Sequence, residues 1–457
     1  MGSEKIKQYF FTTIYCITYI LSYVFFLNPA FEYFGFVLYE KDLFFMAFSC
    51  VIAVIPIIFY RGYKSISSTI SVFIYILVYV PTILTFALGL NVSIFRIIEI
   101  QFLFCSMMCL FFIADRFVFI RNFDNQKFAF ISARFFLILT IILTIYVLYI
   151  YKGNLAFVNI RNVYEHRFAN KIIGSDVVSR YLLSWLSTFF IPVCLIYGLM
   201  NKKKMYFIVG TAACIVVYMA TAAKSALLLP FFLYGLYVLI SRYGVNQIYS
   251  TITLLLSFAI IALLLISPQK DTLLSYFSSL LMWRIVGCGG HLNLWYYDFF
   301  SDNPLTYYSH VGPINFFTES YPYGNLDVGQ VVGSFYWHDK MNANANFWAT
   351  DGIAAYGLTG VIIVSIVLFF IMVLLNTITK KFDKRFILLL FIPFISTLLN
   401  TSLFSTMWSG GGIFLIIFLL FCKKEFYSNS NSKKYITTNE NYNRNRSQTA
   451  VYKSSSY

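Results

Sequence analysis

The chain has 457 residues, of which 59% are hydrophobic and 12% charged, and its mean hydropathy is +0.73. A soluble domain carries about 25% charged residues, so the composition excludes a soluble globular protein and indicates a polytopic integral membrane protein. The net charge of +15 does not call for a nucleic-acid partner, because Lys and Arg gather in the cytoplasmic loops of membrane proteins and set their orientation.

Hydropathy predicts an all-α fold of about twelve transmembrane helices, since each span needs about 20 apolar residues. Nine spans fall within residues 1–267 and three within 349–425, and the seventh, eighth and twelfth are short. The predicted spans are residues 8–27, 42–60, 66–89, 97–114, 130–151, 180–200, 205–222, 225–240, 249–267, 349–376, 386–402 and 410–422. Residues 426–457 are rich in Ser, Asn, Lys and Tyr and are expected to form a disordered cytoplasmic tail.

Basic residues alternate between the loops as twelve crossings require. Runs such as Lys202–Lys204 and Lys380–Lys381 fall on one side of the predicted membrane, which is the cytoplasmic side by the positive-inside rule. Both termini are then cytoplasmic, and residues 268–348 form one large extracytoplasmic loop. We call this segment the outer loop.

The outer loop contains no apolar run long enough to cross a bilayer, and it is rich in aromatic residues. It holds three of the four histidines of the chain, His291, His310 and His338. A polar segment of this length must lie outside the hydrocarbon, and loops of such length are usually functional.

Positive charge also occurs on the predicted outer side. Residues 152–179, which we call the basic loop, include Arg161 and Arg167 and suit an anionic ligand such as phosphate or pyrophosphate. Local pairing or contact with lipid headgroups would equally account for them. Lys224 lies between small residues at a short outer turn, where it either snorkels to the membrane surface or binds an anion.

Arg284 follows an apolar run near the start of the outer loop, in a pattern typical of an amphipathic helix on the membrane face. An arginine in this setting needs an anionic partner. The partner is either a ligand phosphate or a protein carboxylate such as Asp271 or Asp298.

Three asparagines, Asn342, Asn344 and Asn346, alternate with alanine at the end of the outer loop. In an extended strand this spacing points the three amides to one side. Amides bond sugar hydroxyls and aromatic rings cover the apolar faces of pyranoses, so the pattern favours a carbohydrate ligand. Asn346 is also a natural N-cap for the helix that follows.

Two residues are candidates for proton transfer. Asp351 is predicted one turn into the tenth span, where a carboxylate has a function, a partner, or a stabilising role at the helix N-terminus. His338 is the histidine predicted to be best placed for proton transfer, although a single histidine in a polar loop is more often structural. No Cys or His spacing matches a zinc site, and neither a metal nor a cofactor is expected.

Three motifs, in this order, resemble the bacterial O-antigen polymerase and ligase superfamily, which consists of membrane glycosyltransferases of the GT-C type. Ala-Ala-Lys224-Ser-Ala-Leu-Leu resembles the family's Gly-Ser-Arg turn, with lysine in place of arginine. Arg284, Trp295 and Asn303-Pro304 match the residues that open the family's large periplasmic loop. Asn346 to Gly357-Leu358-Thr359-Gly360 matches the segment that closes it. The ligases' catalytic histidine falls on Asn346, which favours a polymerase.

The resemblance implies a donor glycan on undecaprenyl pyrophosphate at the periplasmic face of the bacterial inner membrane. A hydroxyl on the non-reducing-end sugar of a new lipid-linked repeat unit would attack the anomeric carbon, and lipid pyrophosphate would leave. Cations would stabilise the leaving group and a base would assist the hydroxyl. The implied roles are leaving-group stabilisation by Lys224, Arg284, Arg161 and Arg167, proton transfer by His338 or Asp351, and sugar binding by Asn342, Asn344, Asn346 and Trp295.

Membrane lipids are expected partners and, by family, so are a chain-length regulator and a flippase. Three other functions are weighed against a polymerase. An O-antigen ligase would use the same donor, and a repeat-unit flippase or other transporter would have short loops and charges inside its spans. A membrane-bound acyltransferase would need a histidine within a span, and none of the four histidines is predicted there.

Overall fold

The computed structural model describes residues 3–120, 130–158, 166, 170, 173, 176–245, 248–267, 269, 271–338 and 341–426. Within these residues the regular secondary structure is helical. Nine of the helices described are long and apolar enough to cross a membrane, and each coincides with a predicted span. The protein is thus a helical, multi-pass membrane protein, as the composition predicts.

The nine candidate spans contain most of the long helices of the chain. These are α1 (Ser3–Ser22), α4 (Ile66–Ile74) continued by α5 (Val80–Gly89), α6 (Ile94–Ile113), α7 (Ala133–Ile150), α9 (Val177–Trp185) continued by α10 (Ile191–Met200), α11 (Lys204–Thr221), α12 (Lys224–Tyr243), α13 (Ile248–Ile266) and α18 (Ala354–Thr379). The three other predicted spans correspond to shorter helices, which are α3 (Leu43–Val54), α19 (Lys384–Leu398) and α21 (Gly412–Phe421).

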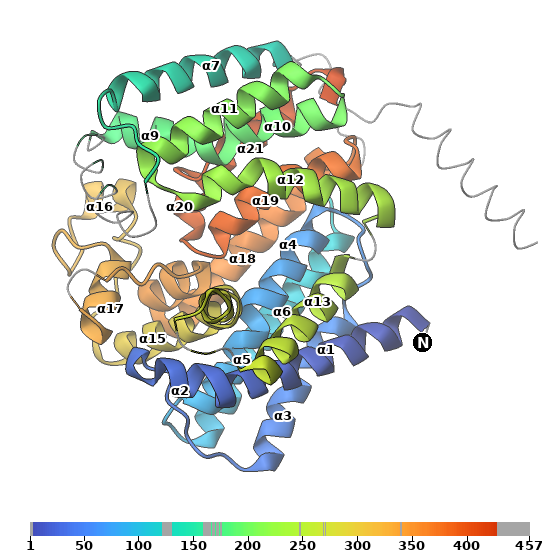
Figure 1. Ribbon diagram of the computed structural model, residues 1–457. Helices are drawn as coiled ribbons and strands as arrows, with labels where there is room; N and C mark the ends of the chain where they lie inside the picture. Colours follow the sequence, from blue (N-terminus) through green and yellow to red (C-terminus); the bar gives the residue numbers. More distant parts are fainter. Residues whose placement is uncertain are drawn as a thin grey trace, which may run out of the picture.

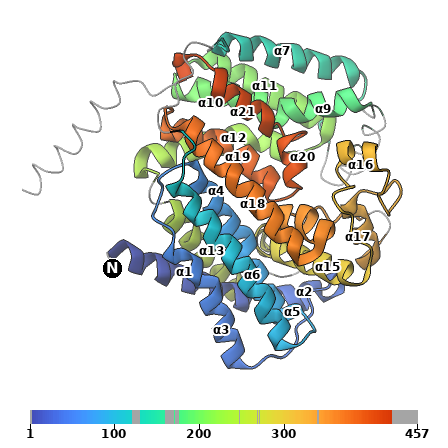
Figure 2. The same ribbon diagram turned by 180° about the vertical axis from the view of Figure 1, so that it is seen from behind.

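The helices form two groups (Figures 1 and 2). Helices α1, α3, α4, α5, α6 and α13 lie together in one group, and α7, α9, α10, α11, α12 and α21 lie together in the other. Helix α19 packs against α10, α12 and α4, so it joins the two groups. Helix α18 packs against α4 and α6 on one side and α21 on the other.

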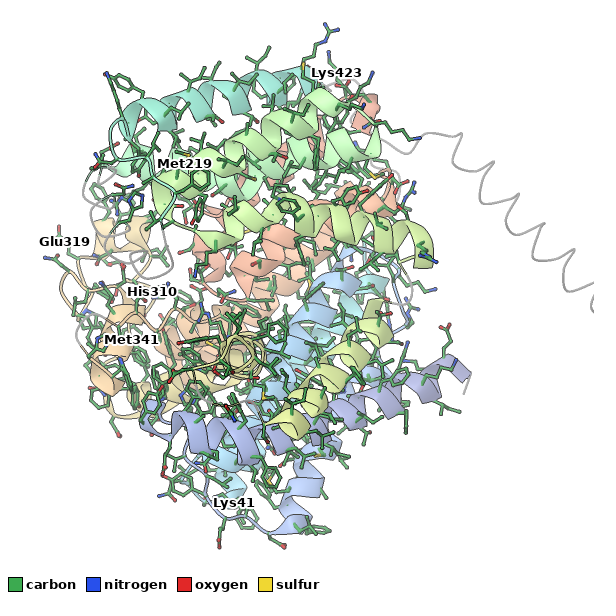
Figure 3. The ribbon with its side chains drawn as sticks, viewed as in Figure 1. Lys41, Met219, His310, Glu319, Met341 and Lys423 are labelled. Atoms are coloured by element: carbon green, nitrogen blue, oxygen red, sulfur yellow. The ribbon has the colours of Figure 1, made fainter. Side chains whose placement is uncertain are left out.

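The described chain begins and ends at one end of the molecule (Figure 1), and Lys423 lies there as well (Figure 3). The Lys5 ammonium donates to the Ile57 carbonyl at 2.7 Å, and Arg61 pairs with Asp115 at 3.3 Å. The Lys384 ammonium lies over the Tyr63 ring, 5.6 Å from its centre. The alternation of basic loops inferred from the sequence therefore corresponds to a physical cluster.

The outer loop lies at the opposite end, which we call the loop end (Figure 1). It contains α14 (Leu273–Ser278), the π-helical segment η9 (Ser279–Gly287), α15 (Cys288–Asp302), α16 (Gly312–Thr318) and α17 (Val328–Tyr336). Aromatic rings attach it to the connection between α1 and α3, with Phe34 4.8 Å from Trp295 and Tyr33 5.1 Å from Trp337 between ring centres.

The tenth predicted span, residues 349–376, is not one continuous helix. Tyr356 (φ −144°, ψ 28°) and Gly357 (φ 59°, ψ −142°) break it. The Trp348 indole N–H donates to the Ser365 hydroxyl at 2.8 Å, and Gly352 lies directly against Val361. The partners of each pair lie equally far along the chain from the break. Residues 348–355 and 358–379 therefore form an antiparallel helical hairpin, and this corrects the predicted start of the span.

The break would leave helix carbonyls without partners, which is costly away from water. The outer loop supplies hydrogen-bond donors for these carbonyls. The Thr306 N–H donates to the Ala354 carbonyl at 2.8 Å, and the Tyr307 N–H donates to the Ala355 carbonyl at 3.1 Å. These two hydrogen bonds fasten residues 306–307 to the top of the hairpin.

Glycine allows the two limbs of the hairpin to touch, and this generates a test. A Cβ at Gly360 would overlap the Gly352 carbonyl oxygen, so Gly360→Ala should force the limbs apart. Overpacking of this kind costs about 1–3 kcal/mol, and we expect a lower thermal unfolding midpoint for the detergent-solubilised protein. The matched variant is Gly235→Ala on α12, where an added Cβ meets no atom within 4 Å. Equal midpoints for the two variants would contradict the hairpin packing.

Candidate functional site

A cavity of about 480 Å³ lies at the loop end of the molecule. Its wall includes residues on both sides of the α15–α16 connection, the segment before α17, and the connection between α19, α20 (Leu403–Met407) and α21. Most of the lining groups are neutral and polar. They include the amides of Asn315, Asn325 and Asn344 and the hydroxyls of Thr350, Thr401, Ser402, Ser405 and Ser409.

His310, labelled in Figure 3, lines this cavity and pairs with Asp351, which lies behind it. The His310 Nε2 atom lies 3.2 Å from Asp351 Oδ1, and the two side chains are 8% and 0% exposed. Asp351 Oδ2 accepts the backbone N–H of Leu403, the first residue of α20. The other ring nitrogen, Nδ1, lies 2.8 Å from the Thr306 hydroxyl.

These contacts suit both protonation states of His310. Thr306 has one hydroxyl proton and two acceptors in reach, His310 Nδ1 and the Ala354 carbonyl at 3.1 Å. A neutral ring donates from Nε2 to Asp351 and accepts from Thr306. An imidazolium donates from both nitrogens, and Thr306 then donates to Ala354. His310 can therefore take up or release a proton while each ring nitrogen keeps a partner.

The local backbone brings His310 to this place. Thr306 is fastened to the hairpin, and Tyr307 and Tyr308 then adopt positive φ angles of 49° and 63°. Such angles are uncommon for residues other than glycine and tend to occur at functional sites. They turn the chain so that the His310 ring returns to the Thr306 hydroxyl and meets Asp351 on the first limb of the hairpin.

Asn344 and Asp351 are the two predicted site residues that belong to this site. Asn344 is exposed and lines the cavity, while Asn342 is exposed on the same side of the segment but lies against Gly329. Asn346 is buried. Its amide donates to Asn293 Oδ1 at 3.0 Å, and its Oδ1 accepts the Trp348 N–H at 3.0 Å. Asn346 thus caps the first limb of the hairpin, which is the structural alternative named above.

Two further predicted residues lie away from the cavity. Trp295 is 2% exposed and stacks on Tyr336 with ring centres 4.8 Å apart, so its side chain belongs to the core of the outer loop. His338 is exposed beside Trp337 and is not part of the cavity wall. The histidine at the cavity is His310, which the sequence does not distinguish from the other two.

The two predicted cations that the structure describes, Lys224 and Arg284, lie outside the cavity wall. Lys224 is exposed at the first position of α12. Arg284 is exposed on η9, where its Nη1 atom contacts Cys288 Sγ at 3.3 Å. The sequence analysis gave Asp271 and Asp298 as possible protein partners of Arg284. Neither carboxylate forms an ion pair with it in the part of the chain described. Arg161 and Arg167 lie outside the described residues.

The basic loop nevertheless approaches Lys224. His166 Nε2 lies 2.8 Å from the Met219 carbonyl, and the Asn170 amide donates to the Ala220 carbonyl at 2.8 Å (Figure 3). Both carbonyls belong to the last turn of α11, immediately before the turn that carries Lys224. His166 and Asn170, the two described residues in the middle of the basic loop that make these contacts, therefore lie against the end of α11.

Within the described ranges, no group of three or more His, Cys, Asp or Glu side chains could hold a metal ion. No protein-family model matches the chain. Neither the curated proteins nor the solved structures include a match.

The third histidine of the outer loop, His291, is structural. It is buried, stacks on Phe36 with ring centres 3.8 Å apart, and donates from Nε2 to the Phe34 carbonyl at 2.8 Å. Its Nδ1 has no hydrogen-bond partner among the described atoms. Burial lowers the pKa of His291 to about 3, so this histidine stays neutral.

The low pKa of His291 predicts an acid-sensitive fold. In an unfolded chain the pKa of histidine is about 6.5. The unfolded state therefore binds more protons than the folded state between about pH 6.5 and pH 3, and stability is lost as the pH falls through this window. Thermal unfolding midpoints in detergent should fall from pH 7 to pH 5, and the fall should be shallower for His291→Gln. Parallel pH profiles for the two proteins would refute this assignment.

Proposed function

We propose that the protein is a membrane glycosyltransferase of the O-antigen polymerase kind. It would cross the bacterial inner membrane about twelve times in a GT-C-like arrangement, with both termini in the cytoplasm. It would transfer the growing glycan from undecaprenyl pyrophosphate to the non-reducing-end sugar of a new lipid-linked repeat unit at the periplasmic face. The observation that carries the proposal is the polar cavity at the loop end, with His310 in its wall and Asp351 paired to His310 behind the wall.

The lining of the cavity supports a carbohydrate ligand. Amide and hydroxyl groups both donate and accept hydrogen bonds, as the many hydroxyls of a sugar require. The wall presents three asparagine amides and several hydroxyls, and Tyr321 adds an aromatic ring. This is the combination that the sequence predicts from its alternating asparagines and its aromatic residues, although only Asn344 of those three asparagines contributes.

The proposed reaction needs one base and a set of cations. The acceptor hydroxyl oxygen forms the new bond to the anomeric carbon while the bond from that carbon to the phosphate oxygen breaks. The hydroxyl proton passes to His310 Nδ1, where the substrate hydroxyl takes the place of Thr306, which retains the Ala354 carbonyl as a partner. Lipid pyrophosphate leaves with the electron pair, and Lys224, Arg284, Arg161 and Arg167 are the candidates to stabilise it.

Asp351 acts through His310 in this scheme. Its carboxylate holds Nε2 and stabilises the imidazolium that forms when Nδ1 takes up the proton.

The alternative is an O-antigen ligase, which would use the same donor and a lipid A-core acceptor. The ligase histidine position is occupied here by Asn346, which is buried as a helix cap.

The glycan profile of a deletion strain tests the proposal. The lipopolysaccharide ladder should collapse to core plus one repeat unit, and His310→Gln or Asp351→Asn should fail to restore it, because a general base contributes about 10²–10⁴-fold. His338→Gln decides between the two histidines, since the geometry predicts that it restores the ladder. Immunoblots and size-exclusion profiles would verify that each variant is expressed and folded.

The other outcomes of this experiment are also informative. Loss of even the single repeat unit from the core would indicate the ligase or a flippase instead of a polymerase. An unchanged ladder would contradict a role in this glycan. Recovery of the ladder by His310→Gln together with failure of His338→Gln would reverse the assignment of the base.

The cations make a separate prediction about charge. Lys224→Ala and Arg284→Ala should each reproduce the single-unit band, because the charge that develops on the leaving group would lose its counter-ion. Lys224→Arg should restore the ladder, since guanidinium binds phosphate at least as well as ammonium does. The matched variant Lys41→Ala removes a half-buried lysine from the connection between α1 and α3, outside the cavity wall, and should leave the ladder unchanged. Normal ladders with both Lys224→Ala and Arg284→Ala would remove these cations from the mechanism.

A further inference from the structure

We propose that the cavity is the acceptor-sugar site and that it selects an uncharged sugar over an acidic one such as a uronic acid. This inference rests on the proposed function and adds to it the chemical class of the acceptor. It follows from the charges around the cavity, from the place of the base, and from two polar side chains that the backbone holds in position.

The charges around the cavity are negative. Among its described lining residues Asp327 is a carboxylate, and none is Lys or Arg. Asp351 stands directly behind His310, and both of its oxygens are already bonded, one to His310 and one to the Leu403 N–H. A sugar carboxylate in this cavity would meet the Asp327 carboxylate, would have the Asp351 carboxylate behind His310, and would find no lysine or arginine among the described lining residues. Removing a charge from water without a partner of opposite sign is costly.

The residues that line the cavity also indicate which of the two substrates binds there, the acceptor sugar or the lipid-linked donor. A pyrophosphate needs cations, and the described cations proposed to serve it, Lys224 and Arg284, lie outside the cavity wall. The acceptor instead needs a base for its hydroxyl, and His310 is in the wall. The donor phosphates therefore belong outside the cavity and the acceptor sugar inside it.

Asn344 and Asp327 are fixed in position before any sugar binds. Asn344 follows Ala343, whose N–H donates to the Gly329 carbonyl at 2.7 Å and whose carbonyl accepts the Tyr296 hydroxyl at 3.1 Å. Asp327 caps α17, and its own N–H donates to Gln330 Oε1 at 3.0 Å. The backbone at Asn344 and the cap at Asp327 are therefore in place before a sugar binds, which lowers the ordering cost of binding. Asn344 is placed for a sugar hydroxyl and Asp327 to repel an anion.

Matched pairs of methyl glycosides test the inference on the full-length protein in lipid nanodiscs. Methyl glucoside and methyl galactoside differ from methyl glucuronide and methyl galacturonide only in a hydroxymethyl group in place of a carboxylate. Titrations followed by saturation-transfer NMR should show at least one neutral glycoside binding, with its uronide at least tenfold weaker. Asp327→Asn, which preserves the helix cap, should narrow the difference at least threefold by strengthening uronide binding.

Two pairs of variants locate the binding. Ser405→Trp fills the cavity from an exposed position on α20 and should abolish binding, whereas Ser106→Trp places the same side chain at an exposed position of α6 and should not. Asn344→Ala should weaken binding of the neutral glycoside at least threefold. Asn400→Ala, which removes an exposed asparagine outside the cavity wall, should leave it unchanged.

The remaining outcomes would overturn either the inference alone or the inference together with the proposed function. Uronides that bind as tightly as their neutral partners, and lose binding in Ser405→Trp, would overturn the charge selection and leave the glycan site intact. A collapsed ladder in the deletion strain without any binding sensitive to Ser405→Trp would show that the acceptor site is elsewhere. No such binding together with an unchanged ladder would overturn both the inference and the proposed function.

Discussion

The reversal of the chain at Tyr356 and Gly357 is the constraint on which the loop end depends. A helix that ends inside a membrane protein leaves carbonyls that water cannot reach, and another segment must satisfy them. Here the Thr306 and Tyr307 N–H groups satisfy Ala354 and Ala355. That requirement fixes residues 306–307 against the hairpin, and His310 follows only three residues later. The site histidine is therefore placed by the same backbone hydrogen bonds that complete a broken helix.

Asp351 extends this construction to a third part of the chain. Its two oxygens join His310 of the outer loop to Leu403 at the start of α20. A buried carboxylate is tolerated only when its partners are complete, and removing one partner costs more than the pair itself contributes. The outer loop, the hairpin and the α19–α20 connection are thus held in one arrangement at the cavity, which is the rigidity that a proton-transfer site requires.

The sequence predicts the large features because composition determines them. Long apolar runs become helices at the expected places, and the outer loop lies at the end opposite the basic clusters. The hairpin could not be predicted, because residues 348–379 read as one helical segment and Gly352 and Gly360 have no periodic signature. Of the two alternatives for Asn346, the helix cap agrees with the hydrogen bond that its Oδ1 accepts from the Trp348 N–H. The choice between His310 and His338 depends on which of them contacts Asp351. His310 and Asp351 are 41 residues apart in the chain, and no local sequence pattern predicts that they meet.

The separation of the cations from the base also has a physical reason. A nearby positive charge disfavours the protonated form of a histidine, and a nearby carboxylate favours it. Cations placed in the cavity to hold a pyrophosphate would therefore oppose the uptake of a proton by His310. The described cavity wall holds no lysine or arginine and His310 is paired with Asp351, while Lys224 begins α12 just after the end of α11. The proposed reaction would accept a proton and release an anion, and such a division would allow both charges to be stabilised at once.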